Sequence, residues 1–397
     1  MENQIRAGGL APEAEVNVAM SVPVAHVMRT YGVHGGERQL GQMFRHSVGS
    51  SVTDYFVFLY RDDVCARYFS GIAGLKFEAL LPFRARQFPS LAREMLVLLL
   101  LLPVLQVRMM GVLRKSEVKI CVAHGLQAGA ACWLAALLMR DVKYVYVHRG
   151  TKSRAGSSSI FKLLYWPFNV VAGVSQASAA SLQPLLMRGR VAVPLENGID
   201  WEELERRASE CETQKDRPFT VIAVGRLMEG KGQGLIIEAF ARFKSLANVS
   251  ARLIFAGDGP DCTRLRHLAS ERGVADCTSF LGAVSNVPCQ LAQSDVFVHA
   301  SESEGLSNAV LEAMAIGLPS VVVEAPGVTE CHVQDETGYV VSRDIEALAS
   351  KLLVLSSDSD LRDRMGKNAR KRVKTNYSIG RNVARYHALY EKLLERT

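Results

Sequence analysis

The sequence predicts an α/β protein built from two doubly wound, parallel-sheet domains that face a central cleft. Three observations support this fold class. Short apolar segments alternate along the chain with longer segments of helical periodicity. The short segments are almost continuously apolar, which is typical of parallel strands covered by helices on both faces. A polar stretch at 206–218 separates two such series, and 397 residues suffice for two or three domains.

The expected strands are rich in Val, Ile, Phe and Tyr. In the first series they are 22–28, 53–60, 118–124, 142–148 and 169–175, and in the second series 219–225, 251–257, 295–301 and 319–324. Helical spacing fills 232–247 and 260–272. We therefore expect a tail at 1–20, an N-terminal domain at 21–205, a C-terminal domain at 206–378, and a helix at 379–397 that packs back across the joint.

Composition and cysteine spacing favour a cytoplasmic globular protein. Hydrophobic residues make up 48% and charged residues 22% of the chain. The eight cysteines include no C-x-x-C pair and indicate neither a zinc site nor a disulfide framework. The first 18 residues are polar and acidic, unlike a secretory signal. We expect reduced thiols in the cytoplasm.

The segment 95–107, "MLVLLLLLPVLQV", is almost wholly apolar. Its 13 residues are fewer than the roughly 20 that a helix needs to cross a bilayer. Two interpretations remain open: a buried core helix, or an in-plane membrane contact with the flanking Arg93 and Arg108 at the headgroups.

Charge is distributed unevenly along the chain. Residues 1–200 contain 22 Lys and Arg against 13 Asp and Glu, a net of +9, and the remainder contains 25 against 27, a net of −2. The two halves should therefore have different partners. No basic stretch is interleaved with aromatic residues, so a nucleic-acid partner is not indicated. An anionic small substrate or an anionic membrane fits the basic half.

The loop that follows the first strand of the second series has residues that suit the binding of a diphosphate. In "GRLMEGKG" (225–232), Arg226 and Lys231 stand among glycines that let a phosphate approach the backbone. Two ordinary solvated cations are the alternative there. "GDGP" (257–260) lacks a full G-x-G-x-x-G and a suitably placed acidic residue, which disfavours an NAD enzyme.

The stretch "SESEGLSNAVLEAMA" (301–315) runs from a strand through a loop into a helix. The amides at 305–307 lie near the expected helix N-terminus, which is a natural anion site. Glu304 begins the loop and should face the cleft. Glu312 lies in an otherwise apolar helix, where an unpaired carboxylate is costly, and a pair of ribose hydroxyls would satisfy it.

These motifs, in this order, resemble the donor domain of retaining GT-B glycosyltransferases of family four (glycosyl transferases group 1). The matching stretches are "GRLMEGKG", "FAGDGP", "SESEGLSNAVLEAMAIGLPSVV" and "ETGYVV", and Glu304 and Glu312 occupy the family's E-x7-E signature. In the first half, "YGVHGGERQL", "HRGTK", "VSQAS" and "LENGID" are similar in style. The resemblance covers nearly the whole chain from about residue 22.

The resemblance implies a role for individual residues. It implies an acceptor-binding N-terminal domain and a nucleotide-sugar-binding C-terminal domain. It places a catalytic role on Arg226, Lys231, Glu304 and His148. It places donor contacts on Gly35, Gly36, Gly225, Gly305, Leu306, Ser307 and Glu312. A lone histidine is more often structural, and the assignment of His148 depends on the resemblance.

The implied reaction is the transfer of a hexose-type sugar from a nucleotide-diphosphate sugar to a hydroxyl of a glycan or lipid-linked acceptor. Arg226 and Lys231 would offset the charge that grows on the departing diphosphate. We expect no cofactor and no metal, since no D-x-D stands at the expected position. No carboxylate is assigned as a nucleophile. A GT-B sugar-nucleotide epimerase and a non-catalytic nucleotide-sugar sensor are the alternatives.

The acceptor side is predicted from the basic surplus of the N-terminal domain. We place Arg149, Lys152, Arg154 and His124 there. Together with the apolar segment 95–107, these cations favour an acceptor carried by a membrane, in bacterial polysaccharide or lipopolysaccharide synthesis, with the enzyme peripheral on the inner face of the cytoplasmic membrane. A basic surface that only aids solubility is the alternative.

Overall fold

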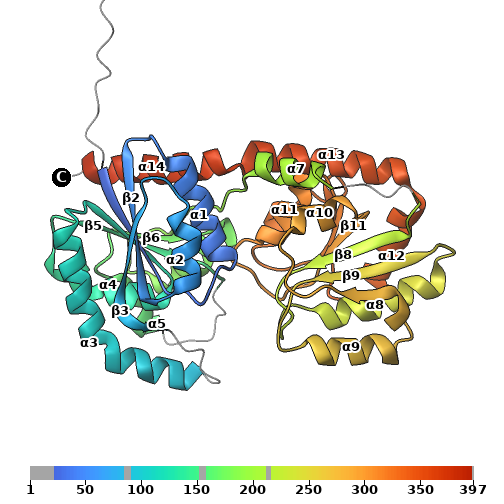
Figure 1. Cartoon of the computed structure of the whole chain (residues 1–397), viewed down its shortest axis with the longest axis horizontal. Coiled ribbons are helices and arrows are strands. Elements are labelled where there is room, and N and C mark those ends of the chain that lie inside the picture. The colour runs from blue at the N-terminus through green and yellow to red at the C-terminus, as the bar shows by residue number, and fades with distance from the viewer. Residues whose placement is uncertain (1–21, 85–90, 152–157, 212–215, 396–397) are drawn as a thin grey trace, which may run out of the picture.

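The computed structural model describes residues 22–84, 91–151, 158–211 and 216–395, and these residues form two α/β domains side by side (Figure 1). Each domain contains one parallel sheet. The first sheet has seven strands in the order β3-β2-β1-β4-β5-β6-β7, and the second has six in the order β10-β9-β8-β11-β12-β13. Both orders reverse once at the first strand of the domain, as in doubly wound folds. The predicted fold class is confirmed.

The N-terminal sheet consists of β1 (Val22–Met28), β2 (Val52–Arg61), β3 (Lys76–Arg84), β4 (Ile120–His124), β5 (Lys143–His148), β6 (Val170–Gly173) and β7 (Val193–Pro194). The helices of this domain are α1 (Gly35–Ser47), α2 (Asp63–Ser70), α3 (Leu91–Lys115), α4 (Leu126–Leu138), α5 (Ser158–Tyr165) and α6 (Gln176–Leu182), with a 3₁₀ turn η1 (Gln183–Leu185).

The C-terminal sheet consists of β8 (Phe219–Val224), β9 (Ala251–Ala256), β10 (Thr278–Phe280), β11 (Val296–His299), β12 (Ser320–Val323) and β13 (Gly338–Val341). Its helices are α7 (Trp201–Ser209), α8 (Gln233–Leu246), α9 (Cys262–Glu271), α10 (Val287–Ala292), α11 (Asn308–Ile316), α12 (Ile345–Ser357) and α13 (Ser359–Asn376), with 3₁₀ turns η2 (Ala275–Cys277) and η3 (Thr329–Cys331).

The nine predicted strands are present, and their ends differ from the prediction by at most two residues. Strands β3, β7, β10 and β13 were not predicted. They lie toward the edges of the sheets, where shorter or more polar segments suffice.

The chain crosses between the domains at its end. Helix α13 lies over the C-terminal domain, and α14 (Ile379–Glu395) lies over the N-terminal domain against α1 (Figure 1). The side-chain amide of Asn382 donates to the carbonyl of Glu196 at 2.6 Å. One apolar core cluster contains residues of both domains, including Val24 and Leu311. The two domains therefore share a packed joint.

Part of the predicted linker is helical. Residues 206–209 form the last turn of α7, whose N-cap Asp200 accepts from the amide of Glu203. The helix buries Leu204 and pairs Glu203 with Arg206 on its outer face, and it packs against α10 and α11. The end of α7 was predicted to be part of a linker because the outer face of this surface helix is charged.

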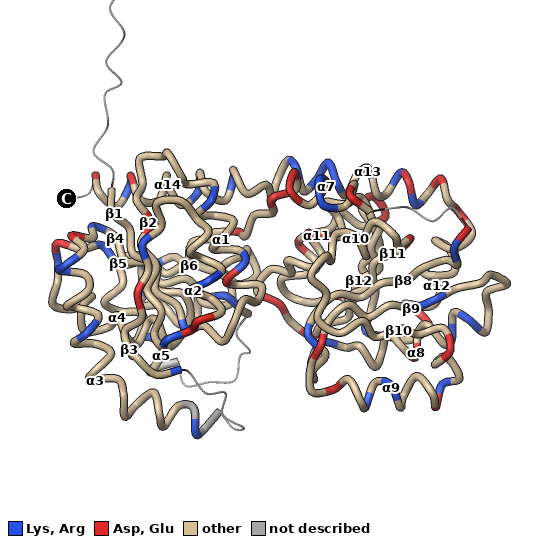
Figure 2. The backbone as a smooth tube through the Cα atoms, viewed as in Figure 1, with Lys and Arg blue, Asp and Glu red and all other residues tan. Residues whose placement is uncertain are grey.

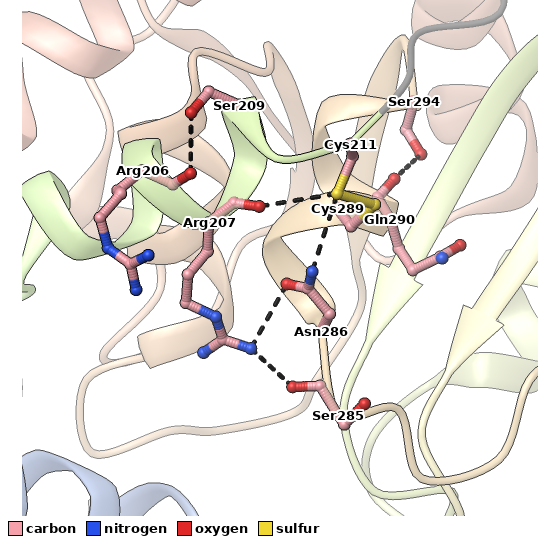
Figure 3. Close-up of a disulfide and its surroundings, with 9 residues drawn as sticks. All are labelled: Arg206, Arg207, Ser209, Cys211, Ser285, Asn286, Cys289, Gln290 and Ser294. Atoms are coloured by element: carbon pink, nitrogen blue, oxygen red, sulfur yellow. Dashed lines mark hydrogen bonds between the residues drawn. A yellow bond between two sulfur atoms is a disulfide. The ribbon is translucent and has the colours of Figure 1, made fainter.

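The expectation that the cysteines form no disulfide is wrong. Cys211, just after α7, is bonded to Cys289 of α10 (Figure 3), with their Cα atoms 5.8 Å apart. The two residues are 78 positions apart in the sequence and come together because α7 packs on α10. Cysteine spacing alone carries no information on such a contact.

Helix α3 contains the apolar segment 95–107 and is longer than that segment, with 25 residues. One face packs into the N-terminal core through Leu98, Leu105, Met109 and Leu113. The opposite face is exposed and equally apolar, with Leu96, Leu99, Leu100, Val104 and Val107. The interpretation as a buried core helix therefore holds for one face only.

Candidate active site

A cavity of about 320 Å³ lies between the two domains, at the carboxyl ends of their strands. Ligands of doubly wound proteins bind at this edge of the sheet. The N-terminal domain contributes Gly35, Gly36, Arg149, Val174 and Asn197. The C-terminal domain contributes Gly225, Arg226, Lys231, His299, Glu304, Gly305, Leu306, Ser307 and Asn308, among others. We call this space the interdomain cavity.

Two of its cations come from the loop that follows β8. Arg226 is exposed, and its guanidinium has no hydrogen-bond partner in the described part of the chain. Lys231 stands before Gly232, which has a φ of +73°. A Cβ at Gly232 would lie 2.0 Å from the carbonyl oxygen of Ala300, so only glycine lets the loop approach β11 this closely. The loop thus holds Lys231 beside the β11 loop.

Glu304 is the carboxylate of the interdomain cavity. Its Oε1 accepts from Lys231 Nζ at 2.6 Å and lies 3.2 Å from His299 Nε2. Burial alone would raise its pKa, but the hydrogen bond from His299 and the charge of Lys231 together outweigh burial and lower the pKa to about 2. Glu304 is therefore ionised at neutral pH.

The loop between Glu304 and α11 brings backbone amides to the interdomain cavity. Ser307 is the N-cap of α11, and its side chain makes no capping bond to the helix. A Cβ at Gly305 would lie 2.3 Å from the carbonyl oxygen of Arg149 in the other domain. Glycine is thus required for the two domains to meet here. The amide groups at this helix end favour an anion.

Asn308 and Asn197 link the domains across the interdomain cavity. Asn308 Nδ2 donates to the carbonyl of Gly35 at 3.2 Å, and its Oδ1 accepts from Asn197 Nδ2 at 3.1 Å. The N-terminus of α1 is thereby tied to the N-terminus of α11. Sequence reasoning did not select these two asparagines, although "LENGID" contains Asn197.

Glu312, the second carboxylate of the E-x7-E pair, is not among the described residues that line the interdomain cavity. It is partly buried in α11, and its carboxylate has no hydrogen bond within the described part of the chain. Burial raises its pKa to about 7, although the charges of Arg38 and Arg207 oppose that shift. The proposed ribose contact stays a prediction.

The three predicted residues at the ends of β4 and β5 differ in position. His148 does not line the described cavity wall; its ring stacks on that of Tyr146 at a centroid distance of 6.4 Å. His124 is buried behind the cavity, whereas Arg149 lines it. Lys152 and Arg154 lie outside the described residues.

His299 is a cavity residue that sequence reasoning missed. It ends strand β11 within "DVFVHAS" and contacts Glu304 directly. The assignment of His148 depended on the family resemblance, whereas His299 lay inside the predicted strand 295–301 and was not singled out. In the described ranges, no cluster of three or more His, Cys, Asp or Glu residues could hold a metal ion. Metal independence itself stays a prediction.

Part of the chain is similar in sequence to known proteins. Residues 205–372 match the family described as Glycosyl transferases group 1. N-acetyl-alpha-D-glucosaminyl L-malate synthase of Bacillus anthracis is 29% identical over 196 residues, which cover 49% of this chain and 50% of that protein.

N-acetylgalactosamine-N,N'-diacetylbacillosaminyl-diphospho-undecaprenol 4-alpha-N-acetylgalactosaminyltransferase of Campylobacter jejuni is 30% identical over 196 residues, which cover 48% of this chain and 52% of that protein. The chain thus matches about half the length of these curated relatives.

The fold is similar over almost the whole chain. The crystal structure of Anabaena HepE in complex with UDP and glucose superimposes with a TM-score of 0.74 at 17% identity, covering 94% of this chain and 100% of that one. At this identity the likeness shows the fold alone. The chain has the GT-B fold, and its resemblance to the glycosyl transferases group 1 family is confirmed, with residues 205–372 as the matched part.

Proposed function

We propose that this protein is a retaining, metal-independent glycosyltransferase that moves a hexose-type sugar from a nucleotide-diphosphate sugar to a hydroxyl of a glycan or lipid-linked acceptor. The observation that carries the proposal is the composition of the interdomain cavity. Arg226, Lys231, the ionised Glu304 and the N-terminus of α11 all border one space at the carboxyl ends of both sheets. Cations and helix amides suit a diphosphate, and a carboxylate suits sugar hydroxyls.

The cations would act mainly as the leaving group departs. When the sugar–phosphate bond breaks, negative charge grows on the diphosphate, and an arginine and a lysine held beside it stabilise that charge. Arg226 is available for this role because it has no partner in the described residues, and Lys231 is held by Glu304 at 2.6 Å. Glu304 would accept hydrogen bonds from hydroxyls of the transferred sugar.

The relatives support the reaction class more than any single acceptor. By name, the Bacillus protein synthesises N-acetyl-alpha-D-glucosaminyl L-malate, and the Campylobacter protein acts on a diphospho-undecaprenol-linked saccharide. HepE was crystallised with UDP and glucose. The two names describe glycosyl products, and the HepE complex adds a nucleoside diphosphate and a sugar, which supports a nucleotide-sugar donor here. We propose a place in bacterial cell-surface polysaccharide or lipopolysaccharide synthesis.

A membrane-borne acceptor is favoured by the outer face of α3. The most apolar 18-residue window of the segment Met95–Lys115 has a mean hydropathy of 2.3, and 22% of that window is buried. Its length and composition would allow a span, but its inner face is packed into the domain core. We therefore propose an in-plane contact with the inner face of the cytoplasmic membrane, in which the exposed leucines enter the bilayer and Arg108, Arg114 and Lys115 meet anionic headgroups.

The test of the proposed function has two steps. Thermal shift with UDP-, GDP-, ADP- and TDP-sugars should identify a donor that raises Tm. That donor is then incubated with glycan and lipid-linked acceptors, and the anomeric configuration of the product is read by NMR. Retention of configuration without added metal is expected. Inversion, or a metal requirement, would contradict that part of the proposal.

The same assay separates the alternatives. A sugar-nucleotide epimerase would convert the donor with no acceptor present, and a sensor would bind the donor without turnover under any condition. Absence of binding to all four donors would overturn the proposed function.

A further inference from the structure

Arg149 is a partly buried cation of the interdomain cavity that has no carboxylate partner among the described residues. It follows β5 and lines the same cavity as Arg226 and Lys231. Within the described ranges it makes no ion pair, and its single hydrogen bond runs from Nη2 to His124 Nδ1 at 3.0 Å. Its Nε is buried with no partner. Burial lowers the pKa of Arg149, which means that the protein surroundings do not compensate its charge fully.

Arg190 shows what a structural arginine of the same domain looks like. Its Nη1 donates to the carbonyls of Tyr165 at 2.9 Å and Trp166 at 3.2 Å, and its Nη2 donates to that of Phe168. Three carbonyl oxygens thus bind the guanidinium of Arg190, while one imidazole nitrogen binds that of Arg149. An unpaired buried charge is costly, and an anion in the cavity would remove that cost.

A chain of buried hydrogen bonds holds Arg149 from behind. A guanidinium can only donate, so His124 Nδ1 accepts and its proton lies on Nε2. His124 Nε2 then donates to His26 Nδ1 at 3.0 Å. His26 in turn directs Nε2–H toward Asp54 Oδ1 at 3.3 Å. Because Arg149 can only donate and the carboxylate of Asp54 can only accept, all the hydrogen bonds in this series run from Arg149 toward Asp54. In this arrangement both imidazoles are neutral.

The surroundings of His124 favour its neutral form. The pKa of His124 is well below its ordinary value because of burial, the charge of Arg149 and the proximity of His26. Tyr390 of α14 places its hydroxyl 3.3 Å from His26 Nε2. Glu37, whose charge acts on Arg149, already accepts from the amide of His34 at 3.1 Å. None of these groups supplies a direct counter-charge to Arg149.

We propose that Arg149 is the third cation of the donor site, which contacts the diphosphate from the N-terminal domain, and that Asp54, His26 and His124 are positioning residues that aim its guanidinium. This inference rests on the proposed function. It moves Arg149 from the acceptor side, where the sequence placed it, to the donor side, and it removes His124 from direct contact with substrate.

The position of Arg149 favours the donor diphosphate over the acceptor. A Cβ at Gly36 would lie 3.8 Å from both Cδ and Nη1 of Arg149, so the guanidinium borders the first turn of α1. The carbonyl of Arg149 packs on Gly305, beside the N-terminus of α11. The residue therefore lies between the two backbone segments to which a diphosphate is expected to bind.

The experiment measures UDP, GDP, ADP and TDP binding by calorimetry, and continues with the diphosphate that binds the wild type. Arg149→Ala should weaken that binding roughly 10-fold or more, as the loss of a charged hydrogen bond requires. Arg149→Gln, which keeps most of the volume, should do the same and serves if the alanine variant is unstable. Arg190→Gln, tested in its folded form, is the matched control and should bind like the wild type.

The positioning residues are tested by a conservative rescue. His124→Gln keeps an oxygen to accept from Arg149 and an amide to donate to His26, and should retain most of the affinity. His124→Leu keeps the volume, loses both bonds, and should approach the affinity of Arg149→Ala. Equal affinities in the glutamine and leucine variants would overturn the positioning role.

Three outcomes separate the inference from the proposed function. Unchanged diphosphate binding in both Arg149 variants would overturn the third-cation assignment. Unchanged donor binding with a raised KM for the acceptor would also overturn it, and would return Arg149 to the acceptor side. A wild-type protein that binds no nucleoside diphosphate would overturn the proposed function, and the inference with it.

Discussion

The two domains share one architecture but have different outer surfaces. Most exposed large apolar side chains among the described residues belong to the N-terminal domain, on α3, α4 and α5 above all. Those of the C-terminal domain are few and scattered: Leu246, Val249, Leu281 and Val354. Helix α3 has no charged residue between Met95 and Val107, and its charges precede and follow that stretch, whereas α9 and α13 carry charged residues along their length (Figure 2).

This difference indicates that the outer surfaces of the two domains contact different surroundings. A helix whose outer and inner faces are both apolar gains nothing from water on its outer side, so a second apolar phase or partner is expected there. On α5, Ile160 and Leu163 extend the apolar surface next to α4, where Trp133 Nε1 donates to the carbonyl of Leu163. The few exposed apolar side chains of the C-terminal domain call for no such partner on its outer surface.

The largest expected effect concerns the C-terminal side of the comparison. Arg226→Ala and Lys231→Ala should each lower kcat by roughly 100-fold or more, because each removes a charge that stabilises the departing diphosphate. Steady-state kinetics at saturating donor measure the loss, and circular dichroism checks the fold. Near-normal kcat in either variant would show that leaving-group stabilisation lies elsewhere.

The next effect concerns the N-terminal surface. Leu99 and Leu100 are 61% and 71% exposed on α3. Changing both to aspartate should reduce co-sedimentation with anionic vesicles at least tenfold, because two apolar anchors become charges that the bilayer and the anionic headgroups both repel. The same change at Leu246 and Val354 of the C-terminal domain is the matched control.

Salt sharpens the same comparison. Anionic vesicles should bind the wild type less at high salt, since screening weakens the contribution of Arg108, Arg114 and Lys115. Equal binding of the aspartate variant and its control, at either salt concentration, would remove the membrane contact and leave the transferase proposal intact.

Much of the C-terminal site could be predicted from the sequence, because its parts are contiguous. Arg226 and Lys231 lie in one loop, and Glu304 to Ser307 in another, each directly after a strand. The hydrogen-bonded chain behind Arg149 could not be predicted in this way. It joins Asp54, His26 and His124 because β2, β1 and β4 are neighbours in the sheet, and strand order is a tertiary property.

The same reasoning explains two further misses. The Cys211–Cys289 disulfide depends on how α7 packs against α10, which no local spacing encodes. The sequence could not show that α3 buries one face and exposes the other, because a uniformly apolar helix has no periodicity to indicate which side faces outward.

The E-x7-E glutamates allow a smaller effect to be tested, on nucleotide binding. Glu312→Gln should weaken nucleoside diphosphate binding several-fold if its partners are ribose hydroxyls, and Glu304→Gln should spare that binding and reduce turnover. Calorimetry with the diphosphate alone separates the two. The reverse pattern would mean that the roles of the two glutamates are exchanged. Glu312 does not line the described cavity wall. If Glu312→Gln leaves nucleoside diphosphate binding unchanged, the ribose contact is excluded.

The smallest expected effect is on stability, where the two glutamates should act in opposite directions. The pKa of Glu312 is raised from 4.5 to about 7, so the folded state binds its proton more tightly than the unfolded state, and stability falls as pH rises from about 4.5 to 7. The pKa of Glu304 is lowered to about 2, so its contribution is present above about 4.5 and is lost as pH falls toward 2. At pH 8, Glu312→Gln should therefore raise Tm by a few degrees and Glu304→Gln should lower it, and the gain from Glu312→Gln should vanish by pH 4. Thermal unfolding of both variants between pH 4 and pH 8 measures this, and shifts of the same sign at pH 8 would show that the two carboxylates do not differ in burial and pairing as the structure places them.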